Sequence, residues 1–196
     1  MSDQEKMATN IAIRAAIDGI TEIMGDNGTK ILFRNINFLN LFENPPDYSW
    51  SPCITVREQW KIYSEVEHIV GLNGAIGIWR RIGYTNLRYA VEIGHVLDVM
   101  KDLPPDERFV KSLEVFCAAS GKGRPVVDEG GHADFDCFDC LLCEGKKVER
   151  PMCSIYEGTT QFILDWSYGR GKYIARETKC KGMGDDTCLF TVSEKE

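Results

Sequence analysis

The first half of the chain has the apolar periodicity of amphipathic helices. Within the first predicted helix, apolar side chains recur every three to four positions, the spacing that gathers them on one helix face: Ile13, Ile17, Ile20, Ile23 and Met24. Gly25 is the expected C-cap of this helix, and a Thr55-to-Glu58 capping box opens a later one. The helices predicted in this way cover residues 9–24, 28–36, 55–70, 73–93 and 104–119.

The predicted helix over 73–93 is unusual because several glycines lie in its first half. Glycine in a helix interior costs about 1 kcal/mol relative to alanine, so we expect either a close helix crossing or room for a ligand here. Aromatic residues are also frequent in this half of the chain, and either His68 or His95 could add a polar group. The combination predicts a mostly apolar ligand pocket. Its candidate residues are Trp60, Gly74, Gly77, Trp79 and Tyr84.

Ordinary core packing is the alternative for each of these aromatic residues taken alone, because large aromatic side chains are usually buried in the core. Only the glycines and aromatics together favour a pocket.

The pattern changes after residue 120, where strand-like alternation replaces helical spacing. Residues 124–129 and 132–137 alternate across a pair of glycines. Residues 172–179 and 187–193 alternate on either side of a Gly-Met-Gly-Asp-Asp turn, which predicts a hairpin. Between the two strand pairs, residues 154–168 return to helical spacing.

This order of elements predicts an α+β fold, with N-terminal helices packed on a small antiparallel sheet. A length of 196 residues with 43% hydrophobic residues suits one domain with a substantial core. We therefore expect a single domain, 1–196, with a mainly helical part (1–120) and a strand–helix–hairpin part (121–196).

Charge and the lack of targeting signals narrow the environment. The net charge of −7 argues against direct binding to nucleic acid or to anionic lipid. The N-terminus lacks a signal-peptide pattern, and no apolar run approaches the roughly 20 residues of a membrane helix. We expect a soluble cytoplasmic protein, in which clustered cysteines are metal ligands more often than disulfides.

A first candidate metal site lies in the last third of the chain. Glu177 and Cys180 are three residues apart, and the glycine-rich turn returns Cys188 to their neighbourhood, while Cys153 precedes the predicted helix. Three thiolates and one carboxylate suit a tetrahedral divalent ion, zinc first. With all four positions filled by protein, the ion would be structural. The alternative is three buried cysteines that act as small apolar residues, with the glutamate at the surface.

A second candidate is the C-x2-C-x2-C run of Cys137, Cys140 and Cys143. Three thiolates at this spacing could bind zinc or three corners of a [4Fe–4S] cluster. The fourth ligand is not evident from the sequence. An external group could serve, and the protein candidates are Cys53, Cys117, His132, Asp136 and Cys153. A reduced thiol loop or a redox disulfide is the alternative.

Signals of common enzyme classes are absent from the sequence. It has no Ser-His-Asp order, no H-E-x-x-H, no Walker loop and no Rossmann fingerprint. Nothing identifies a catalytic base, so a non-enzymatic role is favoured over an enzymatic one.

The segment from Glu177 to Cys188, with Cys140, Cys143 and Cys153 before it, resembles the C-terminal signature of the 4-vinyl-reductase domain family. The resemblance implies the ligand-binding fold shared with haem nitric-oxide sensors and a vesicle-tethering subunit, a fold that often dimerises. In the family's aromatic sensors, a cysteine, a glutamate and two further cysteines bind structural zinc. Those positions correspond here to Cys153, Glu177, Cys180 and Cys188. The extra thiol of Cys137 departs from that pattern.

Three hypotheses follow. The first is a homodimeric sensor or carrier that binds an aromatic or tetrapyrrole-like molecule and contains structural zinc. The second is an iron–sulfur or redox component, such as a reductase subunit, that uses the C-x2-C-x2-C run. The third is an interaction subunit whose helices bind a protein partner without a ligand.

Overall fold

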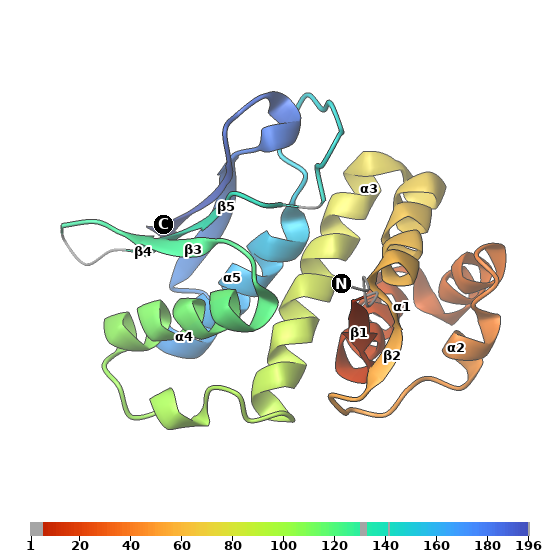
Figure 1. Cartoon of the computed structure of the whole chain (residues 1–196), viewed down its shortest axis with the longest axis horizontal. Coiled ribbons are helices and arrows are strands. Elements are labelled where there is room, and N and C mark those ends of the chain that lie inside the picture. Colours follow the sequence, from red (N-terminus) through yellow and green to blue (C-terminus); the bar gives the residue numbers. More distant parts are fainter. Residues whose placement is uncertain (1–5, 130–132, 141, 196) are drawn as a thin grey trace, which may run out of the picture. The chain divides into compact units, whose positions relative to one another are not determined.

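The computed structural model describes residues 6–129, 133–140 and 142–195 (Figure 1). The chain divides into two compact units, Met1–Gly94 and His95–Glu196. The first unit is helical with a small two-stranded sheet, and the second combines a four-stranded sheet with two main helices. The predicted α+β class is therefore confirmed.

The first unit is built on two long helices that pack against each other, α1 (Asn10–Asn35) and α3 (Val56–Glu92). They approach closely at Gly19, where an added Cβ would lie 3.1 Å from the Ile82 backbone. Isoleucines from both helices are fully buried and form the core. The remaining elements are α2 (Leu39–Glu43), β1 (Met7–Thr9) and β2 (Pro52–Thr55).

Each long helix is interrupted by one glycine. Gly25 in α1 has φ 69° and ψ 170°, and Gly71 in α3 has φ 68° and ψ 168°. Residues that carry a side chain almost never adopt this backbone conformation. The sequence-predicted helix ends near residues 24 and 70 are therefore confirmed, and so is the Thr55–Glu58 capping box.

Two expectations about this unit were wrong in detail. Ile23 was placed on the apolar face of the first helix but is 52% exposed. The short strands β1 and β2 were not predicted, since three or four residues are too few to show alternation.

The second unit begins with α4 (Pro105–Ser120), which follows a 3-10 turn (Asp98–Met100). Its strands are β3 (Arg124–Val127), β4 (Ala133–Cys137), β5 (Tyr173–Lys179) and β6 (Cys188–Glu194), with α5 (Ser154–Tyr168) between β4 and β5. The antiparallel order is β3-β4-β6-β5. A 3-10 turn, Lys181–Met183, lies in the β5–β6 connection.

Strand register decides which side chains face the helices. Phe135 pairs with Phe190, and the two rings stack with centroids 5.5 Å apart. Phe116 from α4 and Tyr156 from α5 both pack on Phe135, so the two helices lie on this face of the sheet. Side chains alternate along a strand, so the same face also carries Cys137, Cys188 and Glu177.

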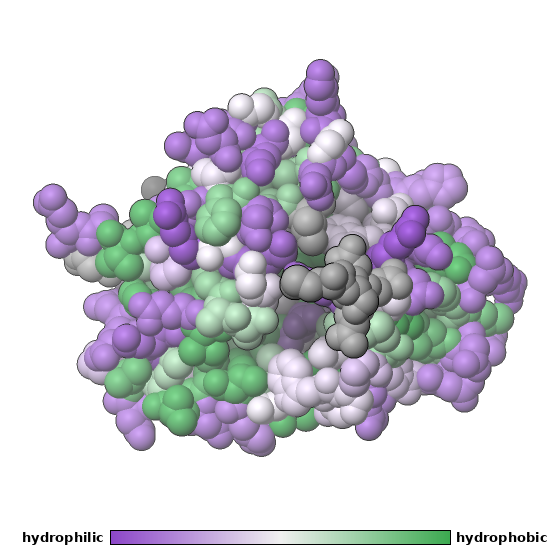
Figure 2. Space-filling view, in the orientation of Figure 1, coloured by the Kyte–Doolittle hydropathy of each residue, from purple (hydrophilic) through white to green (hydrophobic). Residues whose placement is uncertain are grey.

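The face of the molecule drawn in Figure 2 carries both hydrophilic and apolar residues. On the face drawn in Figure 2, hydrophilic residues are spread widely and apolar residues lie between them in smaller areas. Within the described residues, no helix is long and apolar enough to cross a membrane.

Replacing Gly71 or Gly77 with alanine should change the stability of the protein in opposite directions. Gly71→Ala should destabilise the protein by about 1–3 kcal/mol, because its backbone conformation excludes a Cβ. Gly77 is exposed, has helical geometry and open space around it, so Gly77→Ala should stabilise the protein by about 1 kcal/mol. Urea unfolding of both variants measures the difference. Equal effects of the same sign would contradict the kink at Gly71.

Candidate metal centre

Four separate parts of the second unit bring cysteines to one place. Cys140 and Cys143 lie in the loop between β4 and α5, and Cys153 is the residue that precedes the first turn of α5. Cys180 follows β5, and Cys188 opens β6. All five thiols are buried.

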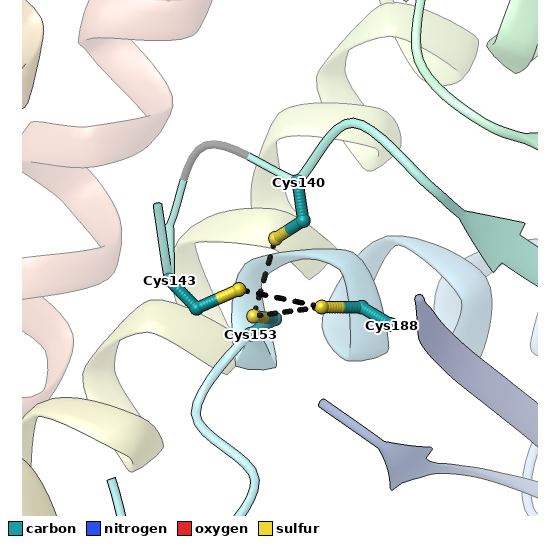
Figure 3. A group of neighbouring side chains, drawn as sticks. All are labelled: Cys140, Cys143, Cys153 and Cys188. Carbon is teal, nitrogen blue, oxygen red and sulfur yellow. Dashed lines mark hydrogen bonds between the residues drawn. The ribbon is translucent and has the colours of Figure 1, made fainter. Parts of the chain in front are cut away.

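The sulfur atoms are close enough to share an ion. Cys153 Sγ lies 3.2 Å from Cys140 Sγ, 3.6 Å from Cys188 Sγ and 3.9 Å from Cys180 Sγ. Cys143 Sγ lies 3.4 Å from Cys188 Sγ. Figure 3 shows the side chains of Cys140, Cys143, Cys153 and Cys188 pointing toward one another from three segments of the chain.

Two groups of four potential ligand atoms result, each with all atoms within 4.8 Å of one another. One group consists of Cys140, Cys143, Cys153 and Cys188. The other consists of Cys153, Glu177, Cys180 and Cys188, the set predicted from the sequence. Both are four-donor sets rich in thiolate, the type that zinc favours.

Glu177 is a buried carboxylate that lacks one partner. Its Oε2 accepts a 2.6 Å hydrogen bond from the Cys153 backbone N–H, which begins α5. Its Oε1 is buried and has no hydrogen-bond partner among the described residues. Burial raises the pKa of Glu177 above its ordinary value. A cation at the thiols would satisfy the free oxygen and favour the ionised carboxylate.

The β5–β6 connection holds Cys180 and Cys188 in place. Asp185 Oδ2 accepts a 2.8 Å hydrogen bond from the Cys180 backbone N–H, and the Lys181 N–H lies 3.4 Å from Cys188 Sγ. Gly182 is buried in the same turn, where an added Cβ would lie 3.2 Å from Cys143 Cβ and 3.6 Å from Cys180 Sγ. The turn thus brings the two ligand groups together.

Desolvation favours the neutral form of the Cys180 thiol. Burial raises the pKa of Cys180 to about 11. Thiolates are the metal-binding form, so a bound divalent ion would release protons from the cluster.

The structure joins residues that the sequence treated as two separate sites. In one group, Cys140 and Cys143 of the C-x2-C-x2-C run lie with Cys153, one of the candidate fourth ligands, and with Cys188, which was not a candidate for this run. Cys137 belongs to neither four-donor group of the described residues, and its Sγ lies 4.0 Å from Asp139 Oδ1.

Other candidates for that fourth ligand do not join the cluster. Cys117 is on α4 and Cys53 is on β2 in the first unit, both half-buried. Asp136 is buried, pairs with Arg124 at 3.3 Å and accepts a hydrogen bond from Thr187. His132 lies outside the described residues.

The candidate pocket residues have packing roles in the first unit. Trp79 is buried and its Nε1 donates to the Tyr63 carbonyl at 3.3 Å. Trp60 packs edge-on against the Tyr63 ring, with centroids 5.4 Å apart. The Arg81 guanidinium lies over the half-buried Tyr84 ring. Gly74 and Gly77 are exposed at the surface of the helix. A ligand pocket formed by these five residues stays a prediction.

A cavity of about 470 Å³ lies beside the thiols and was not predicted from the sequence. Cys140 and Cys143 line it, together with three lysines: Lys122, Lys146 and Lys181. Asp139 and Glu144 also line it, and Asp139 pairs with Lys122 at 3.0 Å. The charged segment 145–150 was the only part of the sequence that hinted at this cavity, through Lys146. Lys122 and Lys181 come from distant positions in the sequence.

The C-terminal segment of the chain matches a known protein family. Residues 133–194, from β4 through β6, match the family model of the 4-vinyl-reductase domain. The resemblance noted in the sequence is therefore confirmed for the segment that the model covers. A search of curated proteins found no match.

Solved structures match over a larger part of the chain. An H-NOX protein from S. oneidensis in the Fe(II)NO ligation state has 13% identity and a TM-score of 0.62, covering 96% of this chain and 100% of the other. The phenol-responsive sensory domain of the transcription activator PoxR has 17% identity and a TM-score of 0.52, covering 68% of this chain and 71% of the other. At these identities the likeness shows a shared fold.

Asp185 and its neighbour Asp186 provide a matched test of the turn. Asp185→Ala removes the acceptor of the Cys180 N–H and should cost about 1 kcal/mol of stability. It should also speed the reaction of the buried thiols with a thiol reagent. Asp186→Ala, exposed in the same turn, should change neither quantity. Identical thiol reaction rates in the two variants would contradict the proposed part of Asp185.

Proposed function

We propose, on the premise that residues 133–194 form a 4-vinyl-reductase domain, that this protein binds a hydrophobic small molecule and that a structural zinc ion stabilises its C-terminal unit. The observation that carries the metal part is the buried donor cluster around Cys153 and Cys188. The shared fold supports the ligand part.

The donor atoms favour a single-ion site over a four-iron cluster. Cysteine sulfurs that bind a [4Fe–4S] cluster sit outside a cube of iron and sulfide, and so lie farther apart than the ligands of one ion. Here four thiols lie within 4.8 Å of one another. Neighbouring sulfurs in a zinc tetrahedron are about 3.8 Å apart for Zn–S bonds near 2.3 Å. The measured separations of 3.2 to 3.9 Å agree with that arrangement.

Zinc here would serve structure rather than catalysis. Each four-donor group fills a tetrahedron with protein atoms and leaves no position for water. An ion bound by Cys153, Glu177, Cys180 and Cys188 would join the start of α5, the end of β5 and the start of β6. A small sheet gains stability from such a cross-link, because the ion binds only the folded arrangement.

The ligand is proposed from the fold and from the surroundings of the histidines. Neighbours of this fold include a phenol-responsive domain and an H-NOX protein whose iron binds NO. His68 and His95 have side chains 80% and 67% exposed, so neither is placed as a buried axial ligand for haem iron. Among the described histidines, none therefore supports histidine-ligated haem, and we favour an aromatic ligand without iron. Homodimer formation and a protein partner stay predictions.

Ligand binding should raise the melting temperature of the purified protein. We expect phenols or larger aromatic compounds to raise it, and matched polar compounds of similar size to leave it unchanged. Binding at 100 times the Kd adds about 2.7 kcal/mol to the free energy of unfolding. Thermal melts with aromatics, fatty acids and porphyrins provide the measurement. The absence of any shift across this panel would contradict the ligand proposal and leave the metal proposal standing.

Metal removal should destabilise the C-terminal unit. If free zinc stands at 1,000 times its Kd, a chelator that removes the ion lowers the free energy of unfolding by about 4 kcal/mol. Cys180→Ser should produce much of this loss, whereas Cys117→Ser, outside both ligand groups, should retain zinc and stability. Elemental analysis and urea unfolding test both variants. Iron with acid-labile sulfide, or unchanged stability in chelator, would contradict structural zinc.

A further inference from the structure

We propose that the cluster binds two divalent ions, with the thiolates of Cys153 and Cys188 bridging them. An inner ion would be bound by Glu177 and Cys180, and an outer ion by Cys140 and Cys143, each completed by the two bridging sulfurs. The inference rests on the proposed zinc site and extends it to a thiolate-bridged pair.

The overlap of the two four-donor groups is the first argument. The groups share Cys153 and Cys188 and differ in the other two members. Together they contain six ligand residues, whereas a single tetrahedral ion uses four. Two tetrahedra that share an edge use all six.

The distances agree with a shared edge. The two bridging sulfurs are 3.6 Å apart, near the edge of about 3.8 Å expected for tetrahedral Zn–S bonds. From this edge, Cys180 Sγ extends one tetrahedron at 3.9 Å from Cys153 Sγ. Cys140 and Cys143 extend the other, at 3.2 Å from Cys153 Sγ and 3.4 Å from Cys188 Sγ.

In either arrangement, single occupancy leaves two buried ligand residues without a metal, although Cys140 and Cys143 keep their hydrogen-bond contacts with the bridging sulfurs. An ion at the outer group leaves Glu177, whose Oε1 has no hydrogen-bond partner among the described residues. An ion at the inner group leaves Cys140 and Cys143, two buried thiols pointing at the bridging sulfurs (Figure 3). A second cation would satisfy whichever pair the first one leaves.

Charge balance favours the pair as well. Five thiolates and one carboxylate carry six negative charges, and burial makes such an excess costly. One divalent ion leaves four of these charges or requires thiols to stay protonated, while two ions leave two. Part of the remainder is offset by backbone N–H groups, including that of Lys181 near Cys188 Sγ.

The two ions would differ in accessibility. Cys140 and Cys143 line the cavity that also contains Lys122, Lys146 and Lys181. Cys153, Glu177, Cys180 and Cys188 are not among the residues that line it. A chelator entering from solvent would therefore reach the outer ion first, and the inner ion would leave in a slower second phase.

The test counts zinc in the full-length protein purified without oxygen. Native mass spectrometry and elemental analysis should give two zinc ions per chain, and a colorimetric chelator should remove them in two phases. The double variant Cys140→Ser/Cys143→Ser should retain one ion and lose the fast phase. Cys117→Ser, on α4 and outside both groups, should retain two. If the double variant does not fold, the zinc count of the wild type still decides the number of ions, and its release in one or two phases still shows whether they differ in accessibility.

Cobalt substitution tests the bridge itself. Two Co(II) ions joined by thiolate sulfur couple magnetically, so the EPR intensity per cobalt should fall as the second ion binds. Additive EPR signals from two bound ions would overturn the bridge. One zinc per wild-type chain would overturn the pair while leaving the structural zinc intact. No zinc, or iron with sulfide, would overturn both.

Discussion

The convergence of buried sulfur atoms on Cys153 and Cys188 is the constraint on which the C-terminal unit depends. Cys153 stands where α5 begins and Cys188 where β6 begins, so their 3.6 Å separation sets the helix start against the sheet. The backbone of Cys153 is also tied to β5 through Glu177. A change in strand register would move these groups apart and remove the cluster.

This cluster explains how a sheet with two short strands keeps a defined arrangement. β3 has four residues and β4 five, and much of the core is a group of aromatic rings around Phe135. Apolar packing holds the centre of the sheet against the helices. The buried thiols lie at the end where β4 leads into the loop and β6 begins.

The candidate metal ligands and the candidate pocket residues lie in different units of the chain. Cluster residues lie in the segment that matches the 4-vinyl-reductase domain, whereas the glycine-rich helix and most of the tryptophans lie in the first unit. A metal centre filled by protein ligands offers no position for a substrate, so small-molecule binding requires other surfaces of the chain.

Local chemistry was readable from the sequence. Gly25 ends a helix because of its backbone conformation, a helix end near residue 70 was expected, Thr55 and Glu58 cap a helix, and residues 154–168 have helical spacing that the structure reproduces as α5. The ligand set of Cys153, Glu177, Cys180 and Cys188 also followed from spacing, and the structure brings these four together. Apart from Cys153, which lies 24 residues before Glu177, each of these features depends on residues near in sequence or on one tight turn.

Only the tertiary structure decided how the two cysteine groups relate. Spacing made Cys137 equivalent to Cys140 and Cys143, but it belongs to neither ligand group of the described chain, although β4 pairs it with Cys188. Whether the loop thiols meet Cys188, 45 residues from Cys143, depends on β4 pairing with β6. Similarly, Trp79 was a candidate for a pocket and is buried in the core of the first unit. Sequence spacing limits what neighbours can reach, whereas long-range pairing determines which distant groups share a site.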